Sequence, residues 1–336
     1  MKQVHYSDYL QLDKILGAQQ PESELRLQPA HDEMLFIIIH QAYELWFKQI
    51  LYEVESVNAI MKQPALNDNS PELQTVVHRL QRTVTILKLL VQQIDVMETM
   101  TPMDFLDFRD MLRPASGFQS WQFKILEARL GLSFRQRHGQ EYYISQLRPE
   151  QVELIKKAEA ELPLLTLLNL WLERMPFLDE APDWFPEYAS VYQSSLTENE
   201  QGNWGLFASV FGWKETESAS PLLADRALSP RACRAALFIM LYRGYPLLQL
   251  PFQLLNVLLE VDEQLSTWRY RHMNMVHRII GTRVGTGGST GKEYLRGAVE
   301  KHSIFREIAQ LTSFLVERRR LPALSTSMER RLGFGT

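Results

Sequence analysis

His40 lies at the end of a strongly apolar stretch and is of a residue type that can do chemistry. Residues 34–39 are all apolar, and at helical spacing His40 shares a face with Phe36, Tyr43 and Phe47. A histidine on such a face must find a hydrogen-bond partner or stay neutral. It is therefore either a hydrogen-bonded core histidine or a ligand or acid–base residue, and its neighbours leave both open.

Arg109 is a second candidate, because its surroundings are apolar although its side chain is always charged. It shares a helical stripe with Phe105 and Leu112. A guanidinium that projects into such an environment needs an anionic partner. That partner is either a carboxylate of the chain itself or the carboxylate of a ligand, which the planar fork can bind with two hydrogen bonds.

Two further histidines, His272 and His277, fall in one segment with a helical pattern. Five residues separate them, which places them about 140° apart around a helix, so both cannot reach one metal ion. His272 shares its face with Trp268, Val276 and Ile279, the more apolar side. This favours His272 as the buried histidine, although a lone buried histidine is a weak sign of a ligand.

Two other patterns suggest a phosphate-binding loop and an iron site at first sight, but their spacing and residue types do not fit either one. Residues 285–292 resemble a phosphate-binding loop, but five residues rather than four separate the outer glycines, and Glu293 stands where Ser or Thr is required. We interpret this segment as a flexible loop that can close over a site. Residues 31–33, His-Asp-Glu, could suggest non-haem iron, but adjacent residues rarely converge on one ion.

The elements that must position these residues are helices. Apolar residues recur at spacings of three and four along the chain, and strand-like alternation is hard to find. Thr101 followed by Pro102, and Ser229 followed by Pro230, are typical helix starts. The pattern predicts an all-α helical bundle with helices at about residues 32–60, 73–99, 102–112, 118–130, 150–174, 230–243 and 251–281.

The segment at about residues 177–229 differs from the rest. Five prolines, counting Pro176 and Pro230, and three tryptophans occur there among polar stretches. We interpret it as a small inserted helical subdomain within a single domain of residues 31–336. Residues 1–30 form a separate N-terminal segment.

Composition excludes several classes of protein. The net charge of −4, from 36 basic and 40 acidic residues spread along the chain, gives no field that would attract nucleic acid. The basic run at residues 318–320 is typical of a solvated face. A single cysteine, Cys233, excludes an internal disulfide, a cysteine-rich zinc site and covalent c-type haem attachment. No apolar run approaches the length of a membrane span or a signal peptide, so we expect a cytoplasmic protein without a membrane partner.

Five segments, taken residue by residue, say more about the family of the protein than the helical periodicity does. Together they resemble, in the same order, the characteristic segments of the haem-dependent tryptophan 2,3-dioxygenase family. The resemblance extends from Tyr6 to about residue 296, nearly the whole chain. The segments are HDEMLFIIIHQAYELWFK at residues 31–48, DFR at 107–109, PASGFQS at 114–120, WRYRH at 268–272 and GTGGS at 285–289.

The resemblance implies a non-covalent b-type haem, with Fe²⁺ in the active form. His272 matches the axial ligand of the haem iron, and His277 falls outside that role. His40 matches the distal histidine, which accepts a hydrogen bond from the indole N–H.

The resemblance also implies a binding site for L-tryptophan. Phe36 and Phe105 would form the walls of the indole pocket, and Arg109 would bind the carboxylate. Ser116 would be a further substrate contact, and Thr286 on the glycine loop would contact the ammonium and carboxylate groups. O₂ would add across the indole C2–C3 bond to give N-formylkynurenine, the first step of tryptophan catabolism by the kynurenine pathway. The alternative is a haem-dependent indole monooxygenase of the same superfamily.

Tyr6 and Tyr9 match residues that in the family reach the site of a neighbouring subunit. The resemblance therefore implies a homotetramer in which residues 1–30 contact a partner. Trp121 departs from the family pattern, which has a smaller leucine there, so the shape of the pocket or interface can differ near this position.

Overall fold

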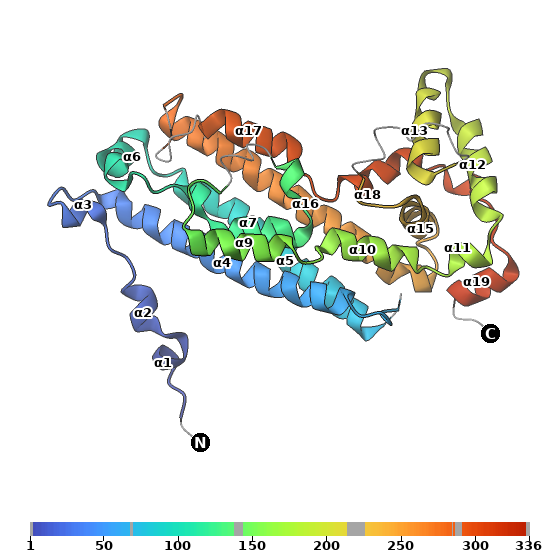
Figure 1. Ribbon diagram of the computed structural model, residues 1–336, viewed down its shortest axis with the longest axis horizontal. Helices are drawn as coiled ribbons and strands as arrows, with labels where there is room; N and C mark the ends of the chain where they lie inside the picture. The colour runs from blue at the N-terminus through green and yellow to red at the C-terminus, as the bar shows by residue number, and fades with distance from the viewer. Residues whose placement is uncertain are drawn as a thin grey trace.

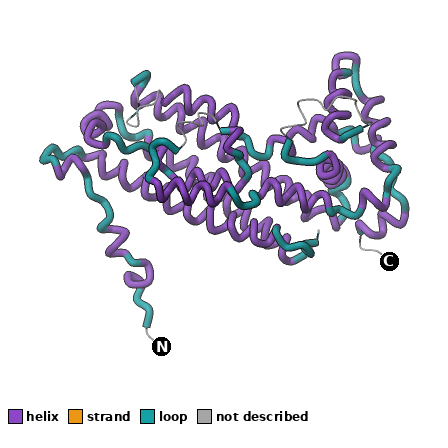
Figure 2. The backbone as a smooth tube through the Cα atoms, in the orientation of Figure 1, coloured by secondary structure: helices purple, strands orange, loops and turns teal. Residues whose placement is uncertain are grey.

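The computed structural model describes residues 3–67, 70–137, 144–213, 226–283, 285 and 291–333. All regular structure within these ranges is helical, and no strand occurs in them (Figure 2). The prediction of an all-α fold is confirmed. No helix in the described ranges combines the length and apolar character that crossing a membrane requires.

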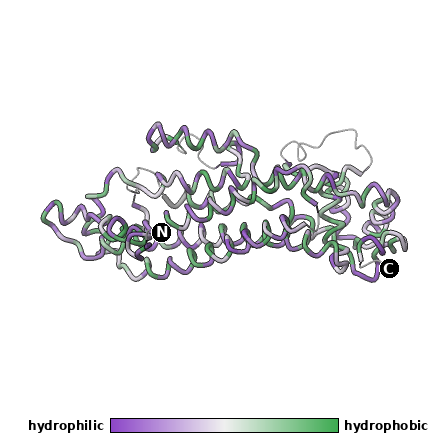
Figure 3. Tube along the Cα trace, turned by 90° about the horizontal axis from the view of Figure 1, so that it is seen from below, coloured by the Kyte–Doolittle hydropathy of each residue, from purple (hydrophilic) through white to green (hydrophobic). Residues whose placement is uncertain are grey.

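Three long helices form the body of the molecule and run along its length (Figure 1). α5 packs against α4 on one side and α16 on the other, and α7 adds to α4. Hydrophobic and hydrophilic stretches alternate along these helices, as expected when each has a buried face (Figure 3). The three long helices are α4 (His31–Met61), α5 (Pro71–Met97) and α16 (Pro246–Ile280), and the shorter α7 spans Trp121–Leu130.

Shorter helices complete the fold. The α-helices are α1 (Tyr6–Leu10), α2 (Leu12–Leu16), α3 (Glu22–Leu25), α6 (Pro102–Arg109), α9 (Pro149–Glu159), α10 (Leu164–Glu173), α11 (Phe177–Glu180), α12 (Trp184–Ser195), α13 (Gly202–Phe211), α15 (Pro230–Leu241), α17 (Gly291–Lys301), α18 (Arg306–Gln310) and α19 (Thr326–Leu332). The 3₁₀ turns are η1 (Asp110–Leu112), η2 (Gly117–Gln119), η3 (Phe134–Gln136), η4 (Glu198–Glu200), η5 (Leu311–Phe314) and η6 (Arg318–Arg320).

Local signals fix several helix ends as predicted. The Thr101 hydroxyl accepts from the Asp104 backbone N–H at 3.3 Å, and the Asp104 carboxylate accepts from the Thr101 N–H at 2.9 Å, so a capping box starts α6. The Ser229 hydroxyl caps α15 in a similar way. Gly131 ends α7 with a φ of 133°, and a Cβ there would meet the Leu165 Cβ at 2.6 Å.

The single helix predicted over residues 150–174 is wrong. The structure has two helices, α9 and α10, separated at residues 160–163. Pro163 has no backbone N–H to continue the first helix, and its ring disfavours helical geometry at Glu161–Leu162. Pro163 instead serves as the residue before α10.

The predicted start of the last long helix, at about residue 251, is also wrong. α16 begins at Pro246 and contains Pro251 in its interior. As the sixth residue of α16, Pro251 lies beyond the first four residues, whose N–H groups have no partner within the helix, so it forfeits one hydrogen bond, to the Leu247 carbonyl. Pro251 is also buried, so packing contributes to keeping it there. The helix predicted over 118–130 begins at Trp121, after the 3₁₀ turn η2.

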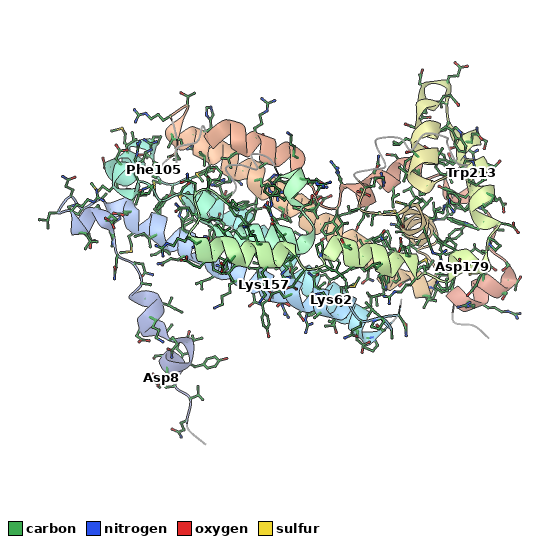
Figure 4. All side chains as sticks on the ribbon, in the orientation of Figure 1. Asp8, Lys62, Phe105, Lys157, Asp179 and Trp213 are labelled. Carbon is green, nitrogen blue, oxygen red and sulfur yellow. The ribbon has the colours of Figure 1, made fainter. Side chains whose placement is uncertain are left out.

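One end of the molecule gathers α11, α12, α13 and α15, with the C-terminal segment beside them (Figure 1). Tyr192 donates its hydroxyl to the Ser313 carbonyl at 3.2 Å, and its ring stacks on Phe207 at 4.7 Å. Trp213 lies at this end (Figure 4). Residues 177–213 thus pack against parts of the chain that follow them in sequence.

The N-terminal arm, comprising α1 and α2, projects away from the bundle (Figure 1). Asp8 on α1 lies far from Phe105 at the end of the bundle (Figure 4). The arm is anchored at its base, where Gln19 donates to the Gln41 side chain at 2.7 Å and the Glu33 carboxylate accepts two backbone N–H groups at the start of α3. The bundle therefore holds the base of the arm and leaves its tip exposed.

Candidate active site

A cavity of about 290 Å³ lies between α4, α6, α7 and α16, with residues of α17 also in its wall. It brings together six of the nine site residues predicted from the sequence. They are Phe36, His40, Phe105, Arg109, Ser116 and His272.

His40 reaches the cavity from α4 as a neutral side chain. Its Nδ1 lies 2.7 Å from the Phe36 carbonyl oxygen, one helical turn earlier. Because a carbonyl only accepts, Nδ1 must carry the hydrogen, and Nε2 keeps its lone pair. Burial lowers the pKa of His40, while the Phe36 hydrogen bond and the charge of Glu44 act in the opposite direction. Nε2 can therefore accept a hydrogen bond at neutral pH.

Aromatic rings form the wall beside His40. The Phe36 ring lies 4.1 Å from the His40 imidazole and 5.7 Å from the Phe105 ring, between centroids. Phe108 meets Phe105 edge to face at 5.4 Å. These rings pack with Met97 and other residues in a small hydrophobic cluster apart from the main core. The wall suits a flat aromatic molecule.

Arg109, the last residue of α6, is 5% exposed and lines the same cavity. Its nearest described carboxylate is that of Asp110, with Nη1 to Oδ1 at 3.7 Å, and the Asp110 side chain is largely exposed to solvent. The distance is at the long end for an ion pair. A carboxylate inside the cavity could bind this guanidinium with better geometry.

His272 reaches the cavity from α16. Its ring stacks on Trp268 with centroids 5.3 Å apart and planes 6° from parallel. Burial, with a smaller contribution from nearby His40, lowers the pKa of His272 to about 4. The imidazole is therefore neutral and retains a lone pair for a metal. His277 is exposed, lies outside the cavity wall and has Nδ1 3.3 Å from the Gly281 carbonyl oxygen.

The remaining predicted residues lie elsewhere. Tyr6 and Tyr9 are 71% and 75% exposed on the projecting arm, so the single chain does not bring them to the cavity. Thr286 and most of the glycine loop fall outside the described residues. Trp121 packs against the main core and does not line the cavity.

The sequence reasoning missed a buried charged cluster in the cavity wall. Glu127 pairs with Arg137, with Arg269 Nη2 at 2.8 Å and with His302 Nδ1 at 3.5 Å. Burial alone would raise the pKa of Glu127, but Arg137, His302 and Arg269 together hold it well below its usual range. Beside this cluster, burial lowers the pKa of Lys124 to about 8. In the sequence, the only indication of this cluster was the WRYRH segment, which contains Arg269.

Residues 31–33, which the sequence does not favour as a metal site, have a structural role at the base of the N-terminal arm. Glu33 is occupied in holding the start of α3. No group of three or more His, Cys, Asp or Glu side chains within the described ranges is placed to hold a metal ion.

A helical bundle that encloses an aromatic cavity, with a neutral histidine from each of two helices and a buried arginine, defines a class of helical enzyme that binds a small aromatic substrate. A family model for tryptophan 2,3-dioxygenase matches residues 1–315. The chain belongs to the tryptophan 2,3-dioxygenase family.

Individual relatives agree over nearly full length. The tryptophan 2,3-dioxygenase of Bdellovibrio bacteriovorus is 41% identical, with 98% of each chain covered. That of Alteromonas mediterranea is 43% identical, covering 98% of this chain and 97% of the relative. That of Xenopus tropicalis is 42% identical, covering 97% of this chain and 85% of the relative. The similarity therefore extends over both the site and the rest of the fold.

Proposed function

We propose that this chain is an oxidoreductase that cleaves the indole C2–C3 bond of L-tryptophan with O₂ and gives N-formylkynurenine, the first step of the kynurenine pathway. The observation that carries the proposal is the meeting of His40, Arg109 and His272 in one aromatic cavity. Family membership and the names of the relatives support the same reaction.

The cavity wall fits a b-type haem on two counts. His272 is neutral and can donate a lone pair to iron. The buried Nε1–H of Trp268 makes no hydrogen bond of good geometry within the described residues, and the nearby Tyr43 hydroxyl already donates to the Leu90 carbonyl, so this N–H suits a carboxylate such as a haem propionate. His272 would hold the iron, and Trp268 with Lys124 would face the propionates. When bound with Fe²⁺, the haem supplies the oxygen chemistry that no side chain can provide.

The chain's own residues bind and orient tryptophan. His40 Nε2 accepts the indole N–H, because its Nδ1 hydrogen is fixed on the Phe36 carbonyl. Arg109 binds the carboxylate through its planar fork. Phe36 and Phe105 flank the ring and exclude water, and Ser116 lies in the wall as a further contact. Thr286 would contact the ammonium and carboxylate groups from the glycine loop.

The exposed arm supports a site shared between subunits in a homotetramer. Tyr6 and Tyr9 present broad apolar faces to solvent, at a cost that burial against a partner would remove. We further propose that residues 1–30 cover a neighbour's cavity, that residues 177–229 act as an inserted subdomain within residues 31–336, and that the protein is cytoplasmic.

The test is to supply haem to the purified protein and record its absorption spectrum with and without tryptophan. We expect a Soret band that shifts when tryptophan is added, and a product that has gained both atoms from ¹⁸O₂ by mass spectrometry. The absence of a Soret band would overturn the proposal. A product with one added oxygen would identify an indole monooxygenase instead.

A further inference from the structure

A second hollow of about 650 Å³ lies at the other end of α16, where the chain turns from α15 into α16 and passes η6. Its wall shares no residue with the cavity described above. Phe252 and Trp268 are 16 residues apart on α16, about 24 Å at 1.5 Å per residue. We call this hollow the α15–α16 groove, and it is lined mainly by Tyr242, Arg243, Tyr245, Gln249, Phe252 and Arg318.

Two polar groups in the wall are already engaged. The Tyr242 hydroxyl donates to the Pro322 carbonyl oxygen at 2.7 Å and accepts from Trp184 Nε1 at 3.0 Å. The Tyr245 hydroxyl donates to the Glu329 carboxylate at 2.9 Å. Both tyrosines therefore offer the groove mainly their rings.

Two positive charges in the wall remain without a counter-charge. Neither Arg243 nor Arg318 forms an ion pair with any carboxylate in the described part of the chain, and the lining contains no Asp or Glu. The other arginines of η6 differ, because Arg319 pairs with Glu317 at 2.6 Å and Arg320 donates to Ser194 at 2.9 Å. The groove therefore has a net positive charge that its own wall does not balance.

The groove also has an apolar surface beside the charges. The Arg243 guanidinium lies over the Phe252 ring, 4.7 Å from its centroid, which holds the guanidinium plane against an aromatic face. Leu241 and Leu321 add aliphatic surface. Gln249 and Gln253, one helical turn apart on α16, add amide groups that can donate or accept.

We propose that the α15–α16 groove binds a small aromatic carboxylate. The carboxylate is held by Arg243 and Arg318, and the ring lies against Phe252, Leu241 and Leu321. A hollow of this size, largely apolar with a few convergent donors, is the usual form of a small-molecule site. Because the groove lies about 24 Å along α16 from the catalytic cavity, its occupant does not block the binding of tryptophan in that cavity.

The experiment uses the full-length, haem-supplied protein in its ferric form, without tryptophan, because tryptophan is itself an aromatic carboxylate and would compete for the groove. Binding of the probe in the catalytic cavity is followed separately by the Soret band. 2-Naphthoate is the probe, and its binding is measured by isothermal titration calorimetry. 2-Naphthalenemethanol, which has the same ring without the charge, is the control ligand. The variants are R243A and R318A, and the matched control is R319A from the same basic turn.

We expect 2-naphthoate to bind, and each of R243A and R318A to weaken its binding about tenfold or more, the effect of losing a hydrogen bond between charged groups. R319A and wild type should bind it equally, and the neutral alcohol should bind much more weakly. If R243A lowers the unfolding temperature, R318A at its exposed position decides the question. Failure of 2-naphthoate to bind, equal binding of the alcohol, or equal effects of R318A and R319A would overturn the proposal.

Discussion

Replacing Glu127 by Gln should destabilise the protein strongly while leaving the size of the side chain unchanged. The Glu127 carboxylate is 4% exposed and holds two guanidinium groups that are themselves buried, those of Arg137 and Arg269. Arg269 also donates to the His302 carbonyl oxygen at 3.1 Å, so the cluster connects α7, the segment after it, α16 and the end of α17. An amide can accept one of these hydrogen bonds but carries no charge to balance the arginines.

The magnitude follows from the burial of every partner. Removing one member of a buried ion pair leaves an uncompensated charge in a region of low polarity, which typically costs about 3–5 kcal/mol. Exposed pairs contribute little, because water screens the attraction. We therefore expect E127Q to lower the free energy of unfolding by about 3–5 kcal/mol. The exposed pair of Asp179 and Arg231 provides the comparison.

The assay is urea denaturation followed by circular dichroism, at one protein concentration for all variants, because association changes apparent stability. D179N is the control and should leave the midpoint unchanged. A loss below about 1 kcal/mol in E127Q, the value usual for exposed pairs, would refute the reasoning.

The lowered pKa of Glu127 predicts that the free energy of unfolding depends on pH. Burial opposes ionisation of Glu127, but its cationic partners outweigh burial and hold its pKa well below the usual range. A carboxyl with a lowered folded-state pKa stabilises the fold above its unfolded pKa of about 4.3, and this stabilisation is lost as the pH falls through the folded value. The difference in stability between wild type and E127Q should therefore be constant at neutral pH and shrink only in acid.

Three further predictions concern the proposed reaction. H272A should fail to hold haem, by absorption spectroscopy, whereas H277A should retain it; the reverse result would reassign the axial ligand. R109K should keep haem but lower kcat/KM for tryptophan about tenfold or more, because lysine lacks the planar fork, and equal turnover of tryptamine and tryptophan by the parent enzyme would contradict that role. Deleting residues 1–10 should weaken tryptophan binding more than it changes the haem spectrum. Mixed oligomers of the deleted chain and H272A should then recover activity, and no recovery in oligomers proven to contain both chains would argue against a shared site.

The sequence by itself determined the helical class and several helix ends, because these depend on neighbours in the chain. Thr101, Ser229 and Gly131 act on the turn beside them, so their residue types suffice to place a start or a stop. The helical period also separated His272 from His277, because residues five apart must face different ways. The exact segments added the family, and with it six of the residues that line the cavity.

Tertiary structure decided what residues far apart in the chain do together. Glu127 meets Arg269 across 142 residues, so no local pattern could reveal that the carboxylate is buried and balanced. Pro251 lies inside a helix because surrounding helices bury it, although the residue type alone suggests a helix start. The α15–α16 groove likewise arises only where η6 folds back beside the start of α16. Helix formation follows from contacts within a turn or two, whereas burial and charge balance depend on which helices pack together.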